Sequence, residues 1–257
     1  MHDQLYSDLS LIAAYDSLNS DRRDRDFYRA RLPAAPARLL DIGCGTGDFA
    51  LECARDGYSV LALDPAPGMI AHARAKDRGR TVDWIVGTMA AIAPCQEVDA
   101  ATMMGHAFQC LLTDADIQAL FARIAGCLSP RGSFLFETRN PAICPWEHWT
   151  PAHAGPPVTL PTGDGVQVID DVLSVEGEVV TFTETYHWTS GKAPTRSLSR
   201  LRFADRPTIT RLAEAAGLRV DAVHGNWDGA DFDEATSPEL IFRLRPTASY
   251  SASAGAP

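Results

Sequence analysis

The sequence predicts an α/β fold with a doubly wound parallel sheet and an inserted antiparallel β cap. Three observations favour this fold class. Short apolar runs alternate with helical stretches, a glycine-rich turn directly follows the first apolar run, and one internal section alternates polar and apolar residues instead.

The composition agrees with one large globular domain. The chain has 257 residues, of which 46% are hydrophobic and 22% charged, close to the averages of globular proteins. Its net charge is −10, and no Lys/Arg cluster is dense enough to neutralise a run of phosphates. We therefore expect no nucleic-acid partner. Four arginines near the N-terminus alternate with aspartates, as on a solvated, salt-bridged helix face: Arg22, Arg23, Arg25 and Arg29.

The cysteines and the N-terminus indicate a cytoplasmic protein. The six cysteines are scattered, without a C-x-x-C pair or a histidine at zinc-ligand spacing, so we expect no metal site and a reducing compartment. No basic segment precedes an apolar stretch at the N-terminus, and nowhere do about 18 apolar residues run together. Neither a signal peptide nor a membrane partner is expected.

The elements follow from periodicity and from breaks at proline and glycine. Residues 3–31 read as two helices, and Pro33 and Pro36 end them. We expect strands at residues 38–42, 59–64, 82–86, 98–104, 133–138, 218–224 and 240–244, and helices at residues 47–56, 67–76, 114–128 and 208–216. The tail from Pro246, rich in Ala and Ser, is expected to be disordered.

Residues 139–205 interrupt the alternation of strands and helices. Residues 166–175, 179–188 and 196–203 alternate polar and apolar side chains, as antiparallel strands do, and the segment Glu176-Gly177-Glu178 predicts a tight turn. We interpret this section as an inserted meander that covers the site.

The segment from Leu39 to Phe49, LLDIGCGTGDF, is an apolar strand that runs into a glycine-rich turn and then a helix. Gly43, Gly45 and Gly47 could make only a tight turn, but alternate glycines after a buried strand also let a ligand approach the backbone. Such turns lie at the carboxyl edge of the sheet, where open α/β folds bind ligands. The dinucleotide fingerprint needs G-x-G-x-x-G. Here Asp48 stands where the third glycine of that fingerprint would be, so a nicotinamide cofactor is disfavoured.

The string DIGCGTG after an apolar strand resembles motif I of the class I S-adenosylmethionine-dependent methyltransferases of the small-molecule type. The resemblance covers roughly residues 36–140 and implies a Rossmann-like seven-stranded sheet. It also implies S-adenosylmethionine as cofactor and S-adenosylhomocysteine as product. The expected divisions are an N-terminal helical lid at 1–35, a cofactor-binding core at 36–140, a substrate cap at 141–205, the rest of the core at 206–245 and a tail at 246–257.

The resemblance carries the cofactor contacts onto the ends of the first four strands. Asp64, at the end of the second strand, is expected to bind both ribose hydroxyls, because a carboxylate accepts two hydroxyl donors. Thr88 stands where the family usually has Asp or Asn, so a backbone contact from Met89 is expected instead. Asp41 either contacts the methionine moiety through backbone amides or caps the turn. The expected cofactor set is Tyr15, Asp41, Gly43, Gly45, Gly47, Asp64, Pro65, Thr88, Met89 and Met104.

The segments GHAFQ and ETRNP, after the fourth and fifth strands, point to the acceptor side of the site. His106 is either a general base with a near-neutral pKa or a hydrogen-bonded residue that shapes the pocket. Aromatic residues after the fifth strand and in the insert are compatible with a flat or apolar acceptor. The expected acceptor contacts are Phe108, Arg139, Asn140, Trp146, Tyr186 and Trp188.

The sequence therefore predicts a methyltransferase, monomeric or homodimeric, that acts on an N, O or C atom of a small molecule. Two alternatives keep the cofactor site: non-methylating sulfonium chemistry such as intramolecular cyclisation, and cofactor binding without catalysis. RNA or protein methylation is a further alternative, and the negative charge disfavours RNA.

Overall fold

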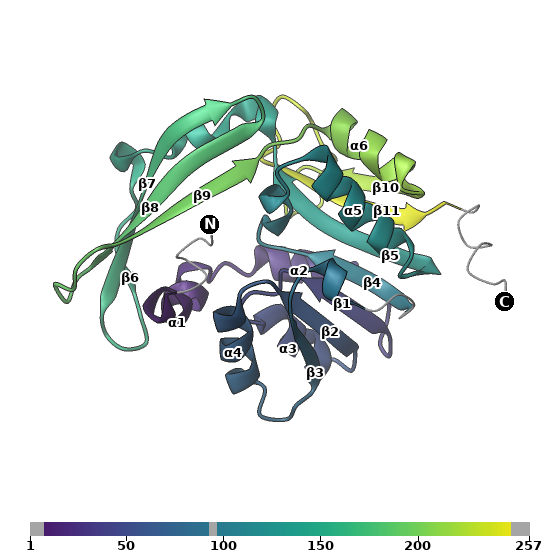
Figure 1. The fold of residues 1–257 in the computed structure, drawn as a ribbon, viewed down its shortest axis with the longest axis horizontal. Helices are drawn as coiled ribbons and strands as arrows, with labels where there is room; N and C mark the ends of the chain where they lie inside the picture. Colours follow the sequence, from purple (N-terminus) through teal and green to yellow (C-terminus); the bar gives the residue numbers. More distant parts are fainter. Residues whose placement is uncertain (1–7, 93–96, 248–257) are drawn as a thin grey trace.

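The computed structural model describes residues 8–92 and 97–247. Two sheets make up its framework, a seven-stranded sheet with helices on both faces and a four-stranded sheet beside it (Figure 1). The predicted fold class is confirmed.

The seven-stranded sheet has the strand order β10-β11-β5-β4-β1-β2-β3. The five consecutive strands β5, β4, β1, β2 and β3 are parallel, whereas β11 pairs antiparallel with both β5 and β10. The strands are β1 Arg38–Ile42, β2 Ser59–Asp64, β3 Val82–Val86, β4 Val98–Met103, β5 Leu128–Arg139, β10 Leu218–His224 and β11 Glu239–Pro246.

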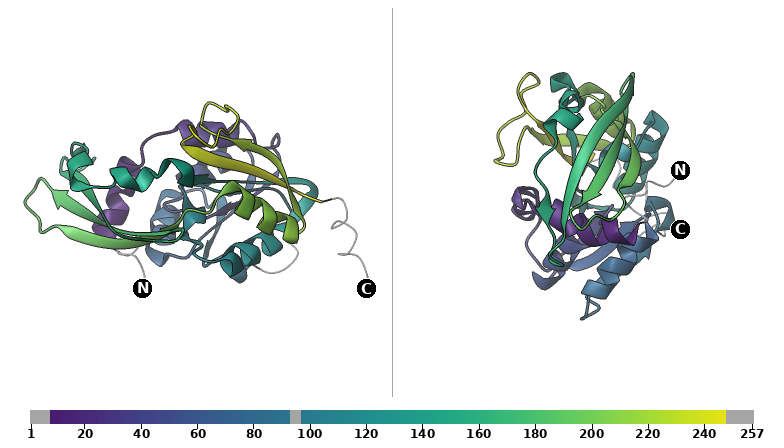
Figure 2. Two further views of the ribbon diagram at one scale, coloured as in Figure 1. Left: turned by 90° about the horizontal axis from the view of Figure 1, so that it is seen from above. Right: turned by 90° about the vertical axis from the view of Figure 1, so that its left-hand side faces the viewer.

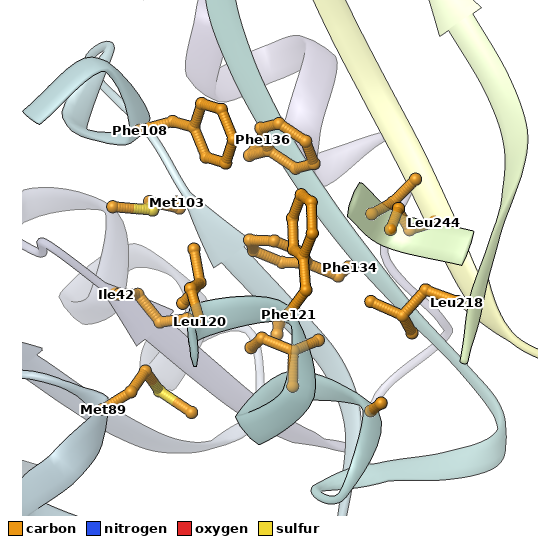
Figure 3. Packing of buried hydrophobic residues seen from close by; sticks show 14 of the residues in the cluster. Ile42, Met89, Met103, Phe108, Leu120, Phe121, Phe134, Phe136, Leu218 and Leu244 are labelled. Atoms are coloured by element: carbon orange, nitrogen blue, oxygen red, sulfur yellow. The ribbon is translucent and has the colours of Figure 1, made fainter. Parts of the chain in front are cut away.

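Helices cover both faces because the central strands bury side chains on both sides. One face packs against α5 and α6, and its core includes a column of phenylalanines (Figure 3) in which the rings of Phe108 and Phe136 lie 4.3 Å apart. The opposite face packs against α2 and α3. The helices are α1 Leu9–Leu18, α2 Arg23–Arg29, α3 Asp48–Arg55, α4 Pro67–Lys76, α5 Asp114–Ala125 and α6 Arg206–Ala215.

The four-stranded sheet, hereafter the cap sheet, is an antiparallel meander in the order β6-β7-β8-β9. Its strands are β6 Val158–Thr159, β7 Gly165–Glu176, β8 Val179–Trp188 and β9 Thr195–Arg202. Gly177, at a φ of 59°, makes the expected tight turn between β7 and β8. The two-residue strand β6 was not predicted, because so short a run has no period.

Helix α1 joins the cap sheet to the seven-stranded sheet. Leu11 and Ala14 pack against Tyr186 of β8, while Ile12 packs against Met69 of α4. The views in Figures 1 and 2 show α1 between the lower end of the cap sheet and the edge near α4. At the other end of the cap sheet, Trp149 packs on Phe182, with 4.7 Å between the rings. Arg202, the last residue of β9, pairs with Asp114 of α5 at 2.6 Å, which ties the cap sheet to a helix of the seven-stranded sheet.

Two boundary predictions are wrong. The helix that starts at Asp114 ends at Ala125 rather than near 128, because Leu128 already pairs with Val98 as the first residue of β5. The last strand extends to Pro246, which pairs with Leu218, so the tail cannot begin there. Residues 248–257, where the rest of the disordered tail was expected, lie outside the described residues, as do Leu5 of the first expected helix and Cys95.

The arginines of the N-terminal region are not merely a solvated helix face. Arg22 pairs with Glu52 at 2.9 Å and Arg29 with Asp56 at 2.5 Å, so both bridge α2 to α3. Sequence alternation could not reveal partners that lie on another helix. Only Arg23, paired with Asp21, fits the expectation of a local ion pair.

Gly47 allows a test of how closely the glycine-rich turn packs. It has a φ of 82°, and a Cβ there would lie 2.4 Å from the ring of Trp84 and 2.8 Å from Ala73. Gly47→Ala is expected to lower the free energy of unfolding by roughly 3 kcal/mol, from the left-handed backbone and the overpacking together. Urea denaturation measures this loss.

Gly163→Ala is the matched control. Gly163 has a similar φ of 86°, but no atom lies within 4 Å of its Cβ position. This variant should lose only about 1 kcal/mol, the cost of the left-handed backbone. Equal losses in the two variants would contradict the packing described for Gly47.

Candidate functional site

The carboxyl ends of β1, β2, β3 and β4 meet along one edge of the seven-stranded sheet because these strands are parallel neighbours. The expected cofactor residues follow these ends: the turn after Asp41, the pair Asp64 and Pro65, the pair Thr88 and Met89, and Met104. The structure therefore brings these residues to one edge.

The glycine-rich turn folds back onto β2. The backbone N–H groups of Gly43 and Cys44 both donate to the carbonyl of Leu63, at 2.8 and 3.0 Å. Gly43, Gly45 and Gly47 all have positive φ angles, of 68°, 53° and 82°. A side chain would be strained at each of these positions, so the turn needs glycine for its own geometry as well as for any ligand.

Asp64 connects the ends of β1 and β2. Its Oδ2 accepts the N–H of Gly45 at 3.0 Å, and its Oδ1 accepts the N–H of Ala66 at 2.8 Å. Burial raises the pKa of the carboxyl, and these two hydrogen bonds oppose the shift. Because each oxygen uses one lone pair in this way, each keeps acceptor capacity for a further hydroxyl donor.

Asp41 is buried inside β1, where its Oδ1 accepts the hydroxyl of Thr102 at 2.9 Å. Burial, opposed by the hydrogen bond from Thr102 and aided by the nearby Asp64, raises the pKa of Asp41 to about 7. The carboxyl of Asp41 makes no hydrogen bond to the turn among the described residues.

Helix α1 is fastened over the glycine-rich turn. Asp16 accepts hydrogen bonds from the hydroxyl of Thr46 in the turn and from Nζ of Lys76 on α4, the latter at 2.8 Å. The neighbouring Tyr15 then lies over the turn, since a Cβ on Gly45 would be 3.7 Å from its ring. Burial, followed by the charge of Asp64, raises the pKa of Tyr15 to about 12. Its phenol is therefore neutral.

The remaining expected cofactor residues differ in their exposure. Pro65 and Thr88 are exposed, and Met104 is half-buried. The Oγ1 of Thr88 accepts the N–H of Ala90. The side chain of Met89 points into the hydrophobic core (Figure 3), which leaves its backbone as the only part available at this edge.

His106 belongs to a buried polar network at the ends of β4, β5 and β11. Its Nε2 lies 2.9 and 3.1 Å from the two carboxylate oxygens of Glu239, and its backbone N–H donates to Oε1 of Glu137 at 2.7 Å. The phenol of Tyr28 on α2 donates to the other oxygen of Glu137. The backbone of His106 is left-handed, with a φ of 56°.

The expected near-neutral pKa of His106 is wrong for the imidazole taken alone. Burial, aided by the Arg139 guanidinium and opposed by Glu137 and Asp24, lowers the pKa of His106 to about 3. Burial raises the pKa of Glu239 to about 7. The imidazole is therefore neutral at neutral pH.

Arg139 lies among carboxylates beneath the cap sheet. Its Nη1 donates to Oε1 of Gln109 at 2.8 Å, and its guanidinium lies 5.3 Å from the centre of the Trp149 ring. Burial lowers the pKa of Arg139, and Glu239, Glu137, Glu184 and Asp170 counteract that shift. Asp170 of β7 is paired directly with Glu184 of β8, so both side chains project from the same face of the cap sheet.

Two residues expected to contact the acceptor have structural roles instead. The ring of Phe108 is buried in the phenylalanine core (Figure 3). The side chain of Asn140 is buried, donates to the carbonyls of Glu234 and Ser237, and accepts the N–H of Ala142. Its hydrogen-bonding capacity is used to fix the loop before β11.

The aromatic residues of the insert pack mainly against one another. Trp146 packs edge-on against Phe203 at 4.6 Å. Tyr186 is buried against α1, and Trp188, half-buried, lies under the ammonium group of Lys192 at 4.6 Å. His187, on the opposite face of β8 from Tyr186 and Trp188, is exposed. Trp146, Tyr186 and Trp188 therefore have packing partners within the insert, on α1 or on Lys192.

Glu239, Asp170 and Glu184 were not predicted from the sequence to lie near the site, and Glu137 was named only within the segment ETRNP. Glu184 shares the face of Tyr186 on β8 by the period of two, so alternation could have found it. Glu239 gave no such signal, because its place beside His106 depends on the insertion of β11 next to β5.

The described residues contain no group of three or more His, Cys, Asp or Glu side chains that could hold a metal ion. In the same part of the chain, no helix has both the length and the apolar character needed to cross a membrane.

Asp41 generates a prediction on stability. Its pKa rises from 3.8 to about 7 on folding, so the folded state binds the extra proton and stability falls as the pH rises through this window. At pH 8 the cost is about 4 kcal/mol. Asp41→Asn should therefore raise the Tm at pH 8 by several degrees and change it little at pH 4.

Thermal unfolding at both pH values measures the effect of Asp41→Asn, and Asp83→Asn, at an exposed aspartate, is the control. A gain independent of pH would contradict the ionisation account.

The similarity to known protein sequences is concentrated in the part of the chain that carries the expected cofactor residues. The family model described as a methyltransferase domain matches residues 39–132, the stretch that includes the glycine-rich turn and Asp64. The ubiquinone biosynthesis O-methyltransferase of Azorhizobium caulinodans is 31% identical over 121 residues, which are 45% of this chain and 45% of that protein. The chain spans less than half the length of the first curated relatives that it matches.

Solved structures extend the similarity to the whole fold. The structure of an amino pentose methyltransferase from Micromonospora echinaspora, with S-adenosylmethionine bound, has a TM-score of 0.68 at 26% identity and covers 96% of this chain and 98% of its own. A methyltransferase from Clostridium acetobutylicum has a TM-score of 0.71 at 13% identity, covering 91% and 96%. Residues 39–132 therefore match a methyltransferase domain, and the described chain has the Rossmann-like fold of these S-adenosylmethionine-dependent methyltransferase structures.

Proposed function

We propose that this protein is an S-adenosylmethionine-dependent methyltransferase that methylates a polar small molecule. The observation that carries the proposal is Asp64, whose two oxygens each hold one backbone N–H at the end of β2 and each keep acceptor capacity beside the glycine-rich turn. The methyltransferase domain match and the class I fold support it.

The residues at this edge fit the cofactor. Gly45 has no side chain to fill the space under Tyr15, and Asp64 presents paired acceptors suited to ribose hydroxyls. Asp48, at the start of α3, is a carboxylate held by Lys76 at 2.6 Å. A carboxylate at this position opposes a pyrophosphate at the helix N-terminus, which again disfavours a dinucleotide. Tyr15, Pro65, Thr88, the backbone of Met89 and Met104 complete the proposed cofactor contacts.

When bound, S-adenosylmethionine supplies an electrophilic methyl group on a positively charged sulfur. The role of the protein is then to hold and orient the reactants and to exclude water. Tyr15 presents a neutral aromatic ring over the turn, and such a ring stabilises a nearby cation. We propose that α1 and α2 form the lid and that the insert at 141–205 forms the substrate cap.

The acceptor is proposed to be polar because charged side chains face the site from the cap sheet and from β5. Arg139 and the cross-strand pair Asp170 and Glu184 offer both signs of charge. The similar proteins act on different acceptor types, an amino pentose in one and, by its name, an oxygen atom in ubiquinone biosynthesis in another. The proposed acceptor atom is therefore nitrogen or oxygen, in a cytoplasmic metabolite.

Cofactor binding is the first prediction of this proposal. Titration calorimetry with S-adenosylmethionine and S-adenosylhomocysteine should show binding of both. Asp64→Asn should weaken both by at least tenfold, about 1.4 kcal/mol, because an amide cannot accept two backbone donors and two hydroxyls. Asp83→Asn, an exposed aspartate on the adjacent strand, should bind as the wild type does.

Absence of binding in folded wild-type protein would reject the proposal, and binding of NADH in its place would restore the dinucleotide alternative. Equal affinities in Asp64→Asn and the wild type would remove Asp64 from the site.

The reaction class is the second prediction. Methyl-labelled cofactor, incubated with a panel of amino sugars, small amines and phenols, should transfer label to a small molecule and not to total RNA or protein. Cofactor consumption without any acceptor would indicate sulfonium chemistry such as cyclisation. Binding without transfer to any member of a broad metabolite extract would favour a non-catalytic protein.

A further inference from the structure

His106 and Glu239 form a carboxylate–imidazole pair that is assembled from two distant parts of the chain. Glu239 begins β11, and His106 follows β4. Nε2 of His106 lies 2.9 and 3.1 Å from the two oxygens of Glu239, and the two side chains are only 19% and 12% exposed. Two nearly equal distances are expected when an N–H points between the oxygens of an ionised carboxylate.

The backbone conformation of His106 fixes the position from which its imidazole extends. The left-handed conformation of His106 is costly for a residue with a Cβ, and the 2.7 Å hydrogen bond from its N–H to Glu137 fixes it. Glu137 is itself fixed by the Tyr28 phenol. With Nε2 directed at Glu239, the other ring nitrogen, Nδ1, has no hydrogen-bond partner among the described residues. Nδ1 then carries the free lone pair of the ring.

We propose that Glu239 is a positioning residue, which fixes the tautomer of His106 so that Nδ1 is free to take the proton released by the methyl acceptor. This inference rests on the proposed function and adds to it a residue outside the matched methyltransferase domain. The acceptor atom loses one hydrogen as a proton when it is methylated. That proton forms a new N–H bond with the lone pair of Nδ1, while the Nε2–H bond remains directed at Glu239.

Glu239 also makes the buried imidazole a stronger base. Without a carboxylate partner, burial would leave His106 unable to hold a proton near neutral pH. The pair already shares one hydrogen between Nε2 and Glu239. When it takes up one further proton, Nδ1 carries a hydrogen, whether the shared hydrogen lies on Nε2 or on Glu239. The pair therefore takes up this proton as a unit.

The surrounding charges set the pH range. Glu137 on β5 and Asp24 on α2 favour protonation of His106, and Arg139 on β5 opposes it. Tyr28, the other titratable group facing the network from α2, is neutral because burial raises its pKa. Since burial raises the pKa of Glu239 to about 7, Nδ1 should be free above this pH and protonated below it. Proton acceptance by Nδ1 is therefore lost as the pH falls through about 7.

Nitrogen-15 NMR of the histidine side chains tests the proposal on the full chain. The signals of His106 are identified by their loss in His106→Asn. In the wild type, Nδ1 should be unprotonated at pH 8 and become protonated near pH 7. In Glu239→Gln, the midpoint for Nδ1 should fall by more than one pH unit, because a neutral amide cannot share the proton. Glu234→Gln is the matched control, an exposed glutamate on the loop before β11.

An unchanged midpoint in Glu239→Gln, or an Nδ1 that is already protonated at pH 8 in the wild type, would overturn the proposal. Calorimetry with S-adenosylhomocysteine on the same samples separates this failure from failure of the proposed function. Glu239→Gln should bind S-adenosylhomocysteine as the wild type does. Loss of binding in every sample, the wild type included, would reject the proposed methyltransferase function, whereas the NMR midpoints alone decide the proposal on His106 and Glu239.

Discussion

The hydrogen bonds from the backbone of Gly45 and Ala66 to Asp64 are the interactions on which the rest of the site depends. They join the turn after β1 to the end of β2, and they fix a buried carboxylate where two parallel strands end. Burial of this carboxyl raises its pKa, so the fold retains it at the expense of stability. A residue that destabilises the unliganded protein in this way is typical of a binding site.

Helix α1 depends on the same turn. Thr46, one residue beyond Gly45, binds Asp16, and Tyr15 then lies over the glycine-rich turn while the opposite side of α1 packs on the cap sheet. Because α1 contacts the cap sheet, α4 and the glycine-rich turn, it links the position of the cap sheet to that of the turn. We propose on this ground that the N-terminal segment belongs to the site, although it precedes the matched methyltransferase domain.

The sequence was sufficient to predict the seven-stranded sheet, the glycine-rich turn and the meander, because each has a local signal in the form of apolar runs, alternate glycines or a period of two. It was less informative about side chains whose partners lie far along the chain. Phe108 was expected at the acceptor and lies in the core, because a 3-10 turn directs its ring toward Phe136. Asn140 was expected beside it and is used by the loop before β11.

The pair of His106 and Glu239 shows the same limit most clearly. The two residues are 133 positions apart in the sequence, which carries no signal of their contact, and they meet only because β11 is inserted antiparallel beside β5. Burial, which shifts the pKa values of both residues in opposite directions, likewise depends on the complete fold. Residue type and position after a strand were enough to single out His106, but its chemical state depends on its neighbours.

The most direct test of the account is a crystal structure of the protein with S-adenosylhomocysteine. The account predicts that both ribose hydroxyls donate to the two oxygens of Asp64, with the ligand beside Gly45 and Tyr15. A ligand bound elsewhere, or one that leaves Asp64 bonded only to Gly45 and Ala66, would contradict it.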